Sequence, residues 1–419
     1  MQPAIRHPRS ANRRIHFIAN CVYGTHLAGG DIHFFEMARA AAEAGFQVNF
    51  FGGHALQHHI AAQGLPAEIT LTEAAQTTGI NPGTLRGQAA LFADYLKRYQ
   101  GTFRRLDRIG GDDVVYATTD YWFDVLPAVK SPAQRKMMIW HMQAPSLAQI
   151  IFRSRADVDL TRLASLHYWK SQNVSLRKFN RCSLKRLLYV HPGMRQGLLG
   201  RGFEEREIKY VSFGVDPEPP GGTDSREKKY DAVWIGRVHR QKGIEDLLQT
   251  LSWLTRKIPG FRAVIIGKVK SELEPVMEKL GLSKVVDFPG FVSEQEKFRL
   301  FRASRVYLMP SRFEGSPRVV GEALICGLPV VAYDVETYRP LFGEFLRYVP
   351  CYDIAAFQRE AEQQVQFSRA GQNYLDRLDL KRFKEECSWQ TARQTFVQTL
   401  SELNNWPTLP HGLAAIDQK

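Results

Sequence analysis

Residues 306–332 read VYLMPSRFEGSPRVVGEALICGLPVVA, and this stretch decides the fold that we expect. The apolar run 306–309 is typical of a buried strand, and a loop follows it. Pro317 suits the first turn of a helix, where a missing N–H costs little, and Gly327 is a typical helix end. The apolar run 329–332 then predicts a second strand. A strand, a helix and a strand in this order indicate one unit of a parallel sheet covered by helices.

The same alternation of strands and helices continues along the chain. A chain of 419 residues is long for one core, because single cores rarely grow beyond about 250–300 residues. Residues 213–229 contain three prolines and three glycines and predict a linker. We therefore predict an α/β protein with two Rossmann-like domains, 1–213 and 214–387, and a tail, 388–419, that opens with an amphipathic helix. Strands are predicted at 15–22, 48–51, 114–117, 137–140 and 187–190, and then at 231–235, 263–266, 285–288, 306–309 and 329–332.

The composition argues against several classes of protein. With 44% hydrophobic and 11% aromatic residues the chain can bury two cores, so disorder is not the default expectation. No apolar run approaches the ~20 residues of a membrane-spanning helix, and the basic N-terminus lacks the apolar segment of a secretory signal. The five cysteines are odd in number and widely spaced, which argues against a disulfide framework. We therefore expect a cytoplasmic protein.

The net charge of +13 is unevenly spread, because residues 162–201 hold nine Lys or Arg residues and no Asp or Glu. Aromatic and apolar residues interleave with these cations. Such a stretch suits an anionic membrane, a nucleic acid or an acidic substrate, and it equally suits a solvated helix whose apolar side faces the core. The residues that we select for a membrane or acceptor face are Trp169, Lys178, Arg181 and Lys185.

Two carboxylates flank the start of the helix predicted after residue 317. Glu314 lies in the preceding loop and Glu322 about one turn into the helix, so both can face one cleft. Carboxylates accept hydrogen bonds from hydroxyl groups, so the pair suits a sugar or a ribose. Free amides and the helix dipole predict an anion site at Gly315, Ser316 and Arg318. The plainer alternative makes Glu314 a helix-end charge and Glu322 a surface residue.

Residues 234–243 read WIGRVHRQKG and give a second signal. A strand ends in this stretch, and Arg237 and Lys242 follow it before a helix begins after Gly243. Two cations at a strand end can neutralise a diphosphate, Arg through a bidentate contact and Lys as a point charge. A departing nucleoside diphosphate gains negative charge as its bond breaks, so fixed cations there favour the transition state. Each cation taken singly is more often a surface charge.

These two stretches resemble the donor-site motifs of the retaining GT-B glycosyltransferases of family 4. The likeness is carried by Gly-Arg and Lys-Gly within 236–243 and by the Glu-x7-Glu spacing at 314–322. It implies two parallel sheets that face each other across a cleft, and a C-terminal helix that crosses back to the first domain. Further matching features are Gly29-Gly30, the strand that ends at His141, Gly-Val-Asp at 214–216, Pro-Gly-Phe-Val at 289–292 and Ser388-Trp389.

The resemblance also implies roles for single residues of the donor site. Arg237 and Lys242 would bind the donor diphosphate. Glu322 would bind the donor ribose, and Glu314 would contact the transferred sugar near the reacting carbon. Pro317 stands where many relatives have Gly, so one amide that could reach the phosphate or the sugar is absent here.

Two further residues of the first domain are assigned in the same way. Gly30 would let the backbone approach the diphosphate, and His141 would lie near the transferred sugar. On the sequence alone, His141 is equally well explained as a packed histidine. The family often has Asp directly after this histidine, whereas Met142 and Gln143 follow it here, so the acceptor side departs from the pattern.

The function implied is a hexosyltransferase that moves a sugar from a UDP- or GDP-linked donor to a lipid-linked, glycan or small-molecule acceptor. The resemblance implies retention of configuration, without a protein nucleophile. We expect no obligatory metal or other cofactor, no nucleic-acid partner, and an enzyme of polysaccharide biosynthesis that is cytoplasmic or peripheral to the membrane.

Three competing interpretations deserve comparison. The Asp157-Val158-Asp159 string would hold a metal in another glycosyltransferase fold, but it lies far from the donor motifs, and chance explains it better. A dinucleotide oxidoreductase would need Gly-x-Gly-x-x-Gly after the first strand and an acidic residue after the second, and both are missing. A non-enzymatic membrane- or nucleic-acid-binding protein on a degenerate GT-B scaffold explains the basic stretch but leaves both donor motifs without a purpose.

Overall fold

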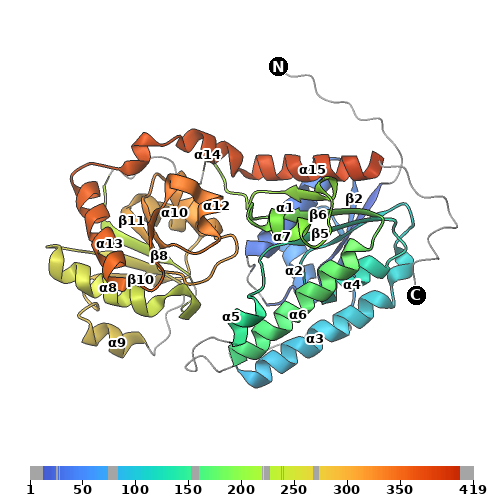
Figure 1. Cartoon of the computed structure of the whole chain (residues 1–419), viewed down its shortest axis with the longest axis horizontal. Helices are drawn as coiled ribbons and strands as arrows, with labels where there is room; N and C mark the ends of the chain where they lie inside the picture. The colour runs from blue at the N-terminus through green and yellow to red at the C-terminus, as the bar shows by residue number, and fades with distance from the viewer. Residues whose placement is uncertain are drawn as a thin grey trace, which may run out of the picture. The chain divides into compact units, whose positions relative to one another are not determined.

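The computed structural model of the chain describes residues 13–24, 27, 29–73, 84–151, 160–218, 220, 227–236, 238, 240–267 and 273–405 (Figure 1). The chain forms two compact units. Unit 1 contains residues 1–190, 194–211 and 392–419, and unit 2 contains residues 191–193 and 212–391. The crossing at 211–212 lies close to the boundary of 213–214 that the sequence suggested.

Unit 1 is built on a sheet of seven parallel strands in the order β3-β2-β1-β4-β5-β6-β7. The order reverses between β1 and β4, and ligands of such sheets bind beyond the carboxyl ends of strands at this kind of switch point. The strands are β1 Arg14–Ile18, β2 Gln47–Gly52, β3 Glu68–Leu71, β4 Val114–Ala117, β5 Arg135–Trp140, β6 Leu184–Tyr189 and β7 Ile208–Tyr210.

Helices alternate with these strands and cover the sheet (Figure 1). α4 is the centre of a helix layer, because both α3 and α6 pack against it. α6 also contacts α5, and α1 and α3 both contact β2. The helices of the unit are α1 Gly29–Glu43, α2 His54–Ala62, α3 Leu85–Phe103, α4 Trp122–Lys130, α5 Leu147–Ile151, α6 Leu160–Asn180 and α7 Met194–Leu199.

Unit 2 repeats this architecture with a sheet of six parallel strands in the order β10-β9-β8-β11-β12-β13. Its switch point lies between β8 and β11. The strands are β8 Tyr230–Ile235, β9 Ala263–Ile266, β10 Val286–Gly290, β11 Ser304–Met309, β12 Val330–Tyr333 and β13 Arg347–Val349. The helices are α8 Ile244–Lys257, α9 Glu274–Lys279, α10 Glu294–Arg302, α11 Arg318–Ile325, α12 Tyr338–Phe342, α13 Ile354–Arg369 and α14 Leu380–Glu386.

The central strands are apolar on both faces because both faces are covered. In β11, Tyr307 and Met309 belong to one hydrophobic core, whereas Val306 and Leu308 belong to the core on the other side of the sheet. Strands buried on both faces form continuous apolar runs instead of alternating ones. The expected α/β fold with two Rossmann-like sheets is confirmed, and every strand predicted from an apolar run has a counterpart in the structure.

The last helix, α15 Trp389–Asn405, begins in unit 2, and its residues from Ala392 onward belong to unit 1. Phe396 packs against Phe17 of β1 and Tyr116 of β4, with ring centroids 6.4 Å and 5.6 Å apart. Arg393 forms an ion pair with Glu36 of α1. The C-terminal helix therefore closes the core of the first unit, as the predicted fold required.

Three kinds of feature are absent from the part of the chain that the structure describes. None of the described helices has the length and apolar character needed to cross a membrane. Within the described residues, no group of three or more His, Cys, Asp and Glu side chains is placed to hold a metal ion. The five cysteines are free thiols.

Candidate active site

Two loops meet at the switch point of the unit 2 sheet. The loop after β8 begins at residue 236 and the loop after β11 at residue 310, and β8 and β11 are neighbouring parallel strands. Parallel strands present their carboxyl ends at the same edge, so the two predicted donor motifs lie side by side. Of the first motif, Arg237 lies outside the described residues.

Gly243 determines how closely these loops approach. Its φ is +66°, and a Cβ built on it would lie 1.9 Å from the carbonyl oxygen of Pro310. Any side chain at this position would therefore collide with backbone. This close approach brings Lys242 to Glu314, and their Nζ and Oε1 atoms lie 2.5 Å apart. The structure thus joins one residue of each predicted motif in an ion pair.

The Glu314 loop is held on several sides by hydrogen bonds to its backbone. The amide of Arg312 donates to the carbonyl of Gln241, and the side chain of Gln241 donates to the carbonyl of Phe313. Thr337 donates its hydroxyl to the carbonyl of Glu314 at 3.0 Å. These bonds hold the backbone of the loop, so they use neither oxygen of the Glu314 carboxylate. Nothing in the sequence pattern had singled out Thr337 or Gln241.

Glu322 is almost completely buried, with 4% of its surface exposed, and it lies in α11. Its Oε1 lies 3.2 Å from Nε of Arg318, one turn earlier. Its Oε2 lies 2.8 Å from Nζ of Lys297, which comes from α10 and is itself 8% exposed. The surface alternative for Glu322 is therefore wrong, and Lys297 is a site residue that the sequence did not reveal.

Tyr307 lies near enough to both carboxylates for their charges to affect its hydroxyl. It is fully buried in β11, and burial raises the pKa of its hydroxyl well above the ordinary value. The negative charges of Glu314 and Glu322 raise this pKa further. The Tyr307 hydroxyl therefore remains protonated and neutral near the carboxyl end of β11.

One part of the predicted anion site is corrected by the structure. The amide of Arg318 donates to the carbonyl of Ser316 at 2.9 Å, so this amide is not free to bind a phosphate, because the tight turn before α11 uses it. The hydroxyl of Ser316, in contrast, is a buried oxygen without a hydrogen-bond partner among the described residues. A buried hydroxyl without a partner is uncommon and fits a place that a ligand would complete.

The predicted residues of unit 1 also meet at the carboxyl ends of central strands. His141 follows β5, and Gly30 lies in the first turn of α1. A Cβ added to Gly30 would lie 3.4 Å from Nε2 of His141, so the imidazole lies directly against this glycine. Nε2 of His141 is 3.2 Å from the carbonyl oxygen of Thr118, which follows β4. The structure thus brings Gly30 and His141 together at the edge that the sequence predicted.

His141 is neutral at physiological pH. Burial lowers the pKa of its imidazole to about 4, and the hydrogen bond to the Thr118 carbonyl opposes this only partly. Bonding to a carbonyl oxygen requires that Nε2 carries the proton, which leaves Nδ1 as an acceptor. A neutral imidazole at this position can accept or donate a hydrogen bond, but it does not supply positive charge.

A buried polar network fixes the segment after His141. The hydroxyl of Tyr168 and the amide of Gln172, one turn apart on α6, both contact Oδ2 of Asp120, at 2.9 Å and 2.5 Å. The same two groups contact the carbonyl of Met142 at 2.9 Å and 2.7 Å, and Gln172 accepts from the amide of Ala144. Burial raises the pKa of Asp120 to about 6. The sequence reasoning missed this network.

The basic stretch does not form one surface, because it folds into α6, β6 and α7. Lys178 and Arg181 are exposed at the end of α6, and Trp169 is half-buried. Lys185 was wrongly selected for an exposed face. It lies in β6 with 6% of its surface exposed and forms an ion pair with Glu207 at 2.7 Å, because β6 is covered on both faces.

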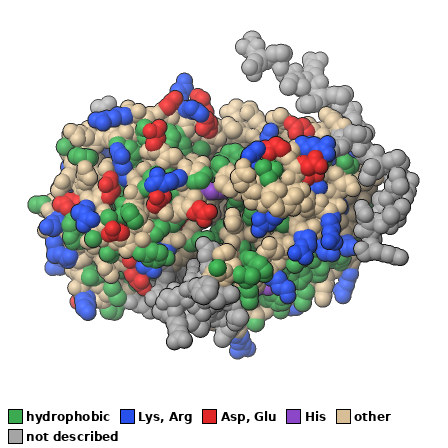
Figure 2. Space-filling model, in the orientation of Figure 1, with side chains coloured by type: hydrophobic (Ala, Val, Ile, Leu, Met, Phe, Trp, Pro, Cys, Tyr) green, Lys and Arg blue, Asp and Glu red, His purple; other side chains and the backbone are tan. Residues whose placement is uncertain are grey.

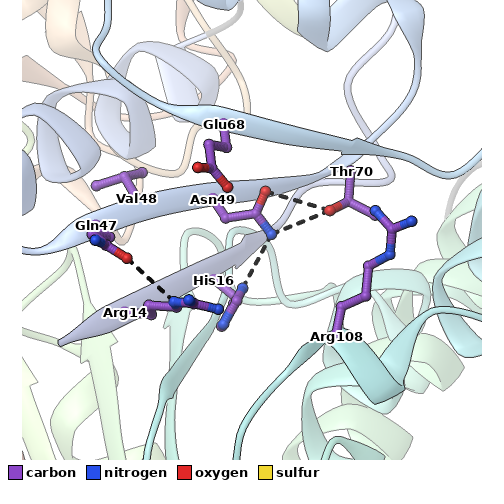
Figure 3. A pocket seen from close by; sticks show the side chains of 8 residues that line it. All are labelled: Arg14, His16, Gln47, Val48, Asn49, Glu68, Thr70 and Arg108. Atoms are coloured by element: carbon purple, nitrogen blue, oxygen red, sulfur yellow. Dashed lines mark hydrogen bonds between the residues drawn. The ribbon is translucent and has the colours of Figure 1, made fainter. Parts of the chain in front are cut away.

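A separate hollow of about 370 Å³ lies over β1, β2 and β3 (Figure 3). His16 uses both ring nitrogens there, toward Asp113 at 2.9 Å and toward the Asn49 amide at 3.1 Å. Thr70 also bonds to Asn49. Several polar side chains of this hollow thus bond to one another or to Asp113. The residues that line the hollow are Arg14, His16, Gln47, Val48, Asn49, Glu68, Thr70 and Arg108.

The architecture matches solved glycosyltransferase structures over almost its whole length. Sucrose-phosphate synthase from Thermosynechococcus elongatus superimposes with a TM-score of 0.69 over 94% of this chain and 99% of that one, at 18% identity. HepE from Anabaena, solved with UDP and glucose, gives a TM-score of 0.64 over 93% and 100%, at 17% identity. This chain has the GT-B fold. At such identities the likeness shows the fold alone.

Sequence comparison finds a match in the half of this GT-B protein that carries the donor motifs. Residues 218–366 match the family model of the glycosyl transferases group 1. An uncharacterised glycosyltransferase of Methanocaldococcus jannaschii is 32% identical over 135 residues, 30% of this chain. The 2-deoxystreptamine N-acetyl-D-glucosaminyltransferase of Streptomyces fradiae is 31% identical over 138 residues, 32% of this chain. The match spans 33% of the length of either relative.

Proposed function

We propose that this GT-B protein transfers a sugar from a nucleoside diphosphate sugar to a hydroxyl group of an acceptor. The observation that carries the proposal is the pairing of Lys242 with Glu314 at the carboxyl ends of β8 and β11, with Glu322 buried one helical turn further on. A fixed cation and two fixed carboxylates match a ligand that combines phosphate groups with hydroxyl groups.

In the proposed reaction unit 2 binds the donor. Lys242 and Arg237 neutralise the diphosphate, which gains negative charge as it leaves the sugar carbon. Glu322 accepts hydrogen bonds from the ribose, and Glu314 contacts the transferred sugar near the reacting carbon. In the ion pair Lys242 already faces Glu314, so an incoming phosphate and sugar would each replace one half of an existing polar contact. Gly315 and Ser316 complete the phosphate and sugar side.

We propose that the transfer retains the configuration of the sugar, as the resemblance to family 4 implies. The acceptor hydroxyl would attack as the diphosphate leaves, and a donor phosphate oxygen would take its proton. Glu314 would then position and stabilise without forming a covalent bond. The chain's own cations carry the charge compensation in this scheme, so it requires no metal ion.

Unit 1 contributes Gly30 and His141 to the proposed reaction. Because Gly30 has no side chain, its backbone can approach the donor phosphates closely. The neutral imidazole of His141 would hydrogen-bond the transferred sugar. The donor would be a UDP- or GDP-linked hexose. A UDP-linked donor is supported by HepE, a protein of the same fold whose structure was solved with UDP and glucose.

We also propose that the acceptor is lipid-linked and is met at an anionic membrane surface. Phe92 of α3 and Leu166 of α6 are 41% and 43% exposed, and the exposed cations Lys178 and Arg181 lie at the end of α6. Figure 2 shows apolar side chains beside basic ones in the region where Figure 1 draws these helices. Apolar groups that insert and cations that attract lipid headgroups together favour peripheral binding.

A thermal-shift panel tests the proposed function. UDP, GDP, ADP and their common sugar conjugates are added to the wild type, Arg237→Ala and Lys242→Met. A nucleotide at ~100 times its dissociation constant should stabilise the wild type by about 2.7 kcal/mol, and both variants should lose most of this shift. Donor hydrolysis or transfer is then measured with the nucleotide that binds.

The panel also distinguishes the proposed function from the alternative, a non-enzymatic binding protein. A wild-type protein that no nucleotide stabilises, and that instead binds DNA or vesicles in a strongly salt-dependent way, would favour a degenerate scaffold with a binding function. A nucleotide that stabilises the wild type and both variants equally would place the donor elsewhere.

A further inference from the structure

We infer that Lys297 is a specificity-determining residue of the donor site, which orients Glu322 so that both of its oxygens can receive the vicinal hydroxyl groups of a ribose. This inference rests on the proposed function and adds to it a residue from α10. The first support is the position of the ammonium group, 2.8 Å from Oε2 of Glu322, with 8% of the lysine surface exposed.

A buried lysine needs a specific reason, because removing an ammonium group from water costs several kcal/mol unless it is paired. Lys297 has two carboxylate partners, the buried Glu322 at 2.8 Å and Glu294 at 3.3 Å, whose side chain is 62% exposed. The ammonium also lies 4.4 Å from the ring centre of Phe298. The shorter of the two ion pairs joins the two buried members, so Lys297 is directed toward Glu322.

Glu322 is thereby held at both oxygens. Arg318 contacts Oε1 and Lys297 contacts Oε2, at 3.2 Å and 2.8 Å. Each carboxylate oxygen can accept about two hydrogen bonds. Among the residues that the structure describes, each oxygen has one cationic partner, so one acceptor position remains on each. The two cations come from different helices, α11 and α10, and they therefore fix the rotation of the carboxylate plane.

A carboxylate held in this way matches two neighbouring hydroxyl groups. The 2′- and 3′-hydroxyls of a ribose can donate to the two oxygens in parallel, as a guanidinium does in a bidentate contact. A carboxylate that is free to rotate would accept one hydroxyl in many orientations and would discriminate less. Lys297 thus acts through Glu322, and its effect is predicted on the choice between a ribonucleotide and a 2′-deoxyribonucleotide.

The experiment compares the affinities of UDP, GDP and ADP with those of their 2′-deoxy counterparts, using isothermal titration of the full chain. A hydrogen bond to a charged group typically changes affinity by roughly ten- to a hundredfold. The wild type should prefer the ribonucleotide by about tenfold or more. Lys297→Met should reduce this preference to within about threefold, whereas Lys297→Arg should retain most of it.

Arg299→Met is the matched control, because Arg299 lies on the same helix and pairs with Glu296 at the surface. It removes a cation and an ion pair without touching Glu322, so its preference should equal that of the wild type. If Lys297→Met keeps the full preference while it binds the ribonucleotide, the inference is overturned and the proposed function stands. If the wild type binds no nucleoside diphosphate, the proposed function itself fails.

A loss of folding in Lys297→Met would be recognised by thermal unfolding, and Lys297→Arg then decides the question. The arginine keeps the positive charge but places it on a longer, planar group. A folded Lys297→Arg protein that binds ribonucleotide and 2′-deoxyribonucleotide in the wild-type ratio supports orientation by charge. The same protein with a ratio near one would show that a positive charge at this position does not orient Glu322, and it would contradict the inference.

Discussion

Nζ of Lys242 lies 2.5 Å from Oε1 of Glu314, although 72 residues separate them in the sequence. The contact exists because β8 and β11 are parallel neighbours whose carboxyl ends face the same edge. The ion pair therefore depends on the register between these two strands. Such an ion pair would couple phosphate binding to the position of the carboxylate beside the sugar. A phosphate that binds Lys242 would release Glu314, which could then contact the sugar.

Separate substitutions of this pair should affect different kinetic constants. Lys242→Met removes the charge that faces the diphosphate and should weaken nucleotide binding by about tenfold or more. Glu314→Gln keeps the size and the hydrogen-bonding capacity but removes the charge near the reacting carbon, so it should lower kcat by roughly a hundredfold. Titration calorimetry and initial rates measure the two effects. Lys284→Met, an exposed position of unit 2, is the control, and equal losses in both constants for both variants would contradict the separation of roles.

Gly243→Ala should be far more damaging than the same change at Gly260. Both glycines have nearly the same φ, +66° and +67°, so a left-handed backbone costs the two substitutions about the same free energy. The added Cβ at Gly243 would lie 1.9 Å from the Pro310 carbonyl, whereas the one at Gly260 meets nothing within 4 Å. We expect Gly260→Ala to cost about 1–2 kcal/mol and Gly243→Ala to cost about 2 kcal/mol more and to abolish nucleotide binding. Thermal unfolding with and without nucleotide measures both, and similar results would show that the loops can separate cheaply.

Continuous apolar runs made the central strands predictable, whereas three of the four strands at the sheet edges escaped detection. β3, β7 and β13 have three or four residues each, and all three lie at an edge. Only one residue in each is buried. A strand with one covered face has no need of an apolar run, so its sequence carries little signal. The first strand was predicted too long for a related reason, because Ala19, Cys21 and Val22 keep the following loop mostly apolar, and most of this loop is buried.

The residues of the candidate site also divide into those that a local pattern reveals and those that only the tertiary fold reveals. Glu314 and Lys242 belong to local patterns, so their spacing revealed them. Lys297 and Asp120 do not, because their partners come from other elements and only the tertiary fold brings them together. The misplacement of Lys185 has the converse cause. Its sequence neighbourhood is basic, but its environment is set by Glu207, which the fold places beside it.

His141 should act as a neutral group throughout the working range of pH. Burial lowers its pKa to about 4, so the kcat/KM profile should contain no step from this residue between pH 5.5 and 8. His141→Gln should lower kcat by roughly tenfold or more while nucleotide affinity is retained. A stopped-flow or initial-rate profile of both proteins measures this. A rate that requires the protonated imidazole would appear as a rise toward acidic pH in the wild type that the variant lacks, and it would contradict a neutral role.

Asp120 should make the protein less stable as pH rises. Its folded pKa, about 6, exceeds the ordinary value of 3.8 because of burial, so between these pH values the folded state binds more protons than the unfolded state. Stability from this group is therefore lost as pH rises through 6. Relative to Asp120→Asn, the wild type should lose about 1–2 kcal/mol between pH 5 and pH 8. Urea unfolding at both pH values measures this difference. Asp107→Asn, an exposed carboxyl of the same unit, controls for general charge effects, and a difference that grows in the opposite direction would refute the assignment.

The exposed cations of α6 should control binding to anionic vesicles. Each Lys or Arg near such a surface contributes about 1 kcal/mol, so Lys178→Glu with Arg181→Glu should weaken partitioning onto phosphatidylserine-containing vesicles by well over tenfold. Phe92→Ser should weaken it separately and without a change in salt dependence, because it removes an apolar contact. Sedimentation with vesicles measures both. The control, Lys257→Glu with Lys279→Glu, makes the same charge change on exposed positions of unit 2. If the control and the α6 variant lose binding equally, the attraction comes from the net charge of the chain and not from this surface.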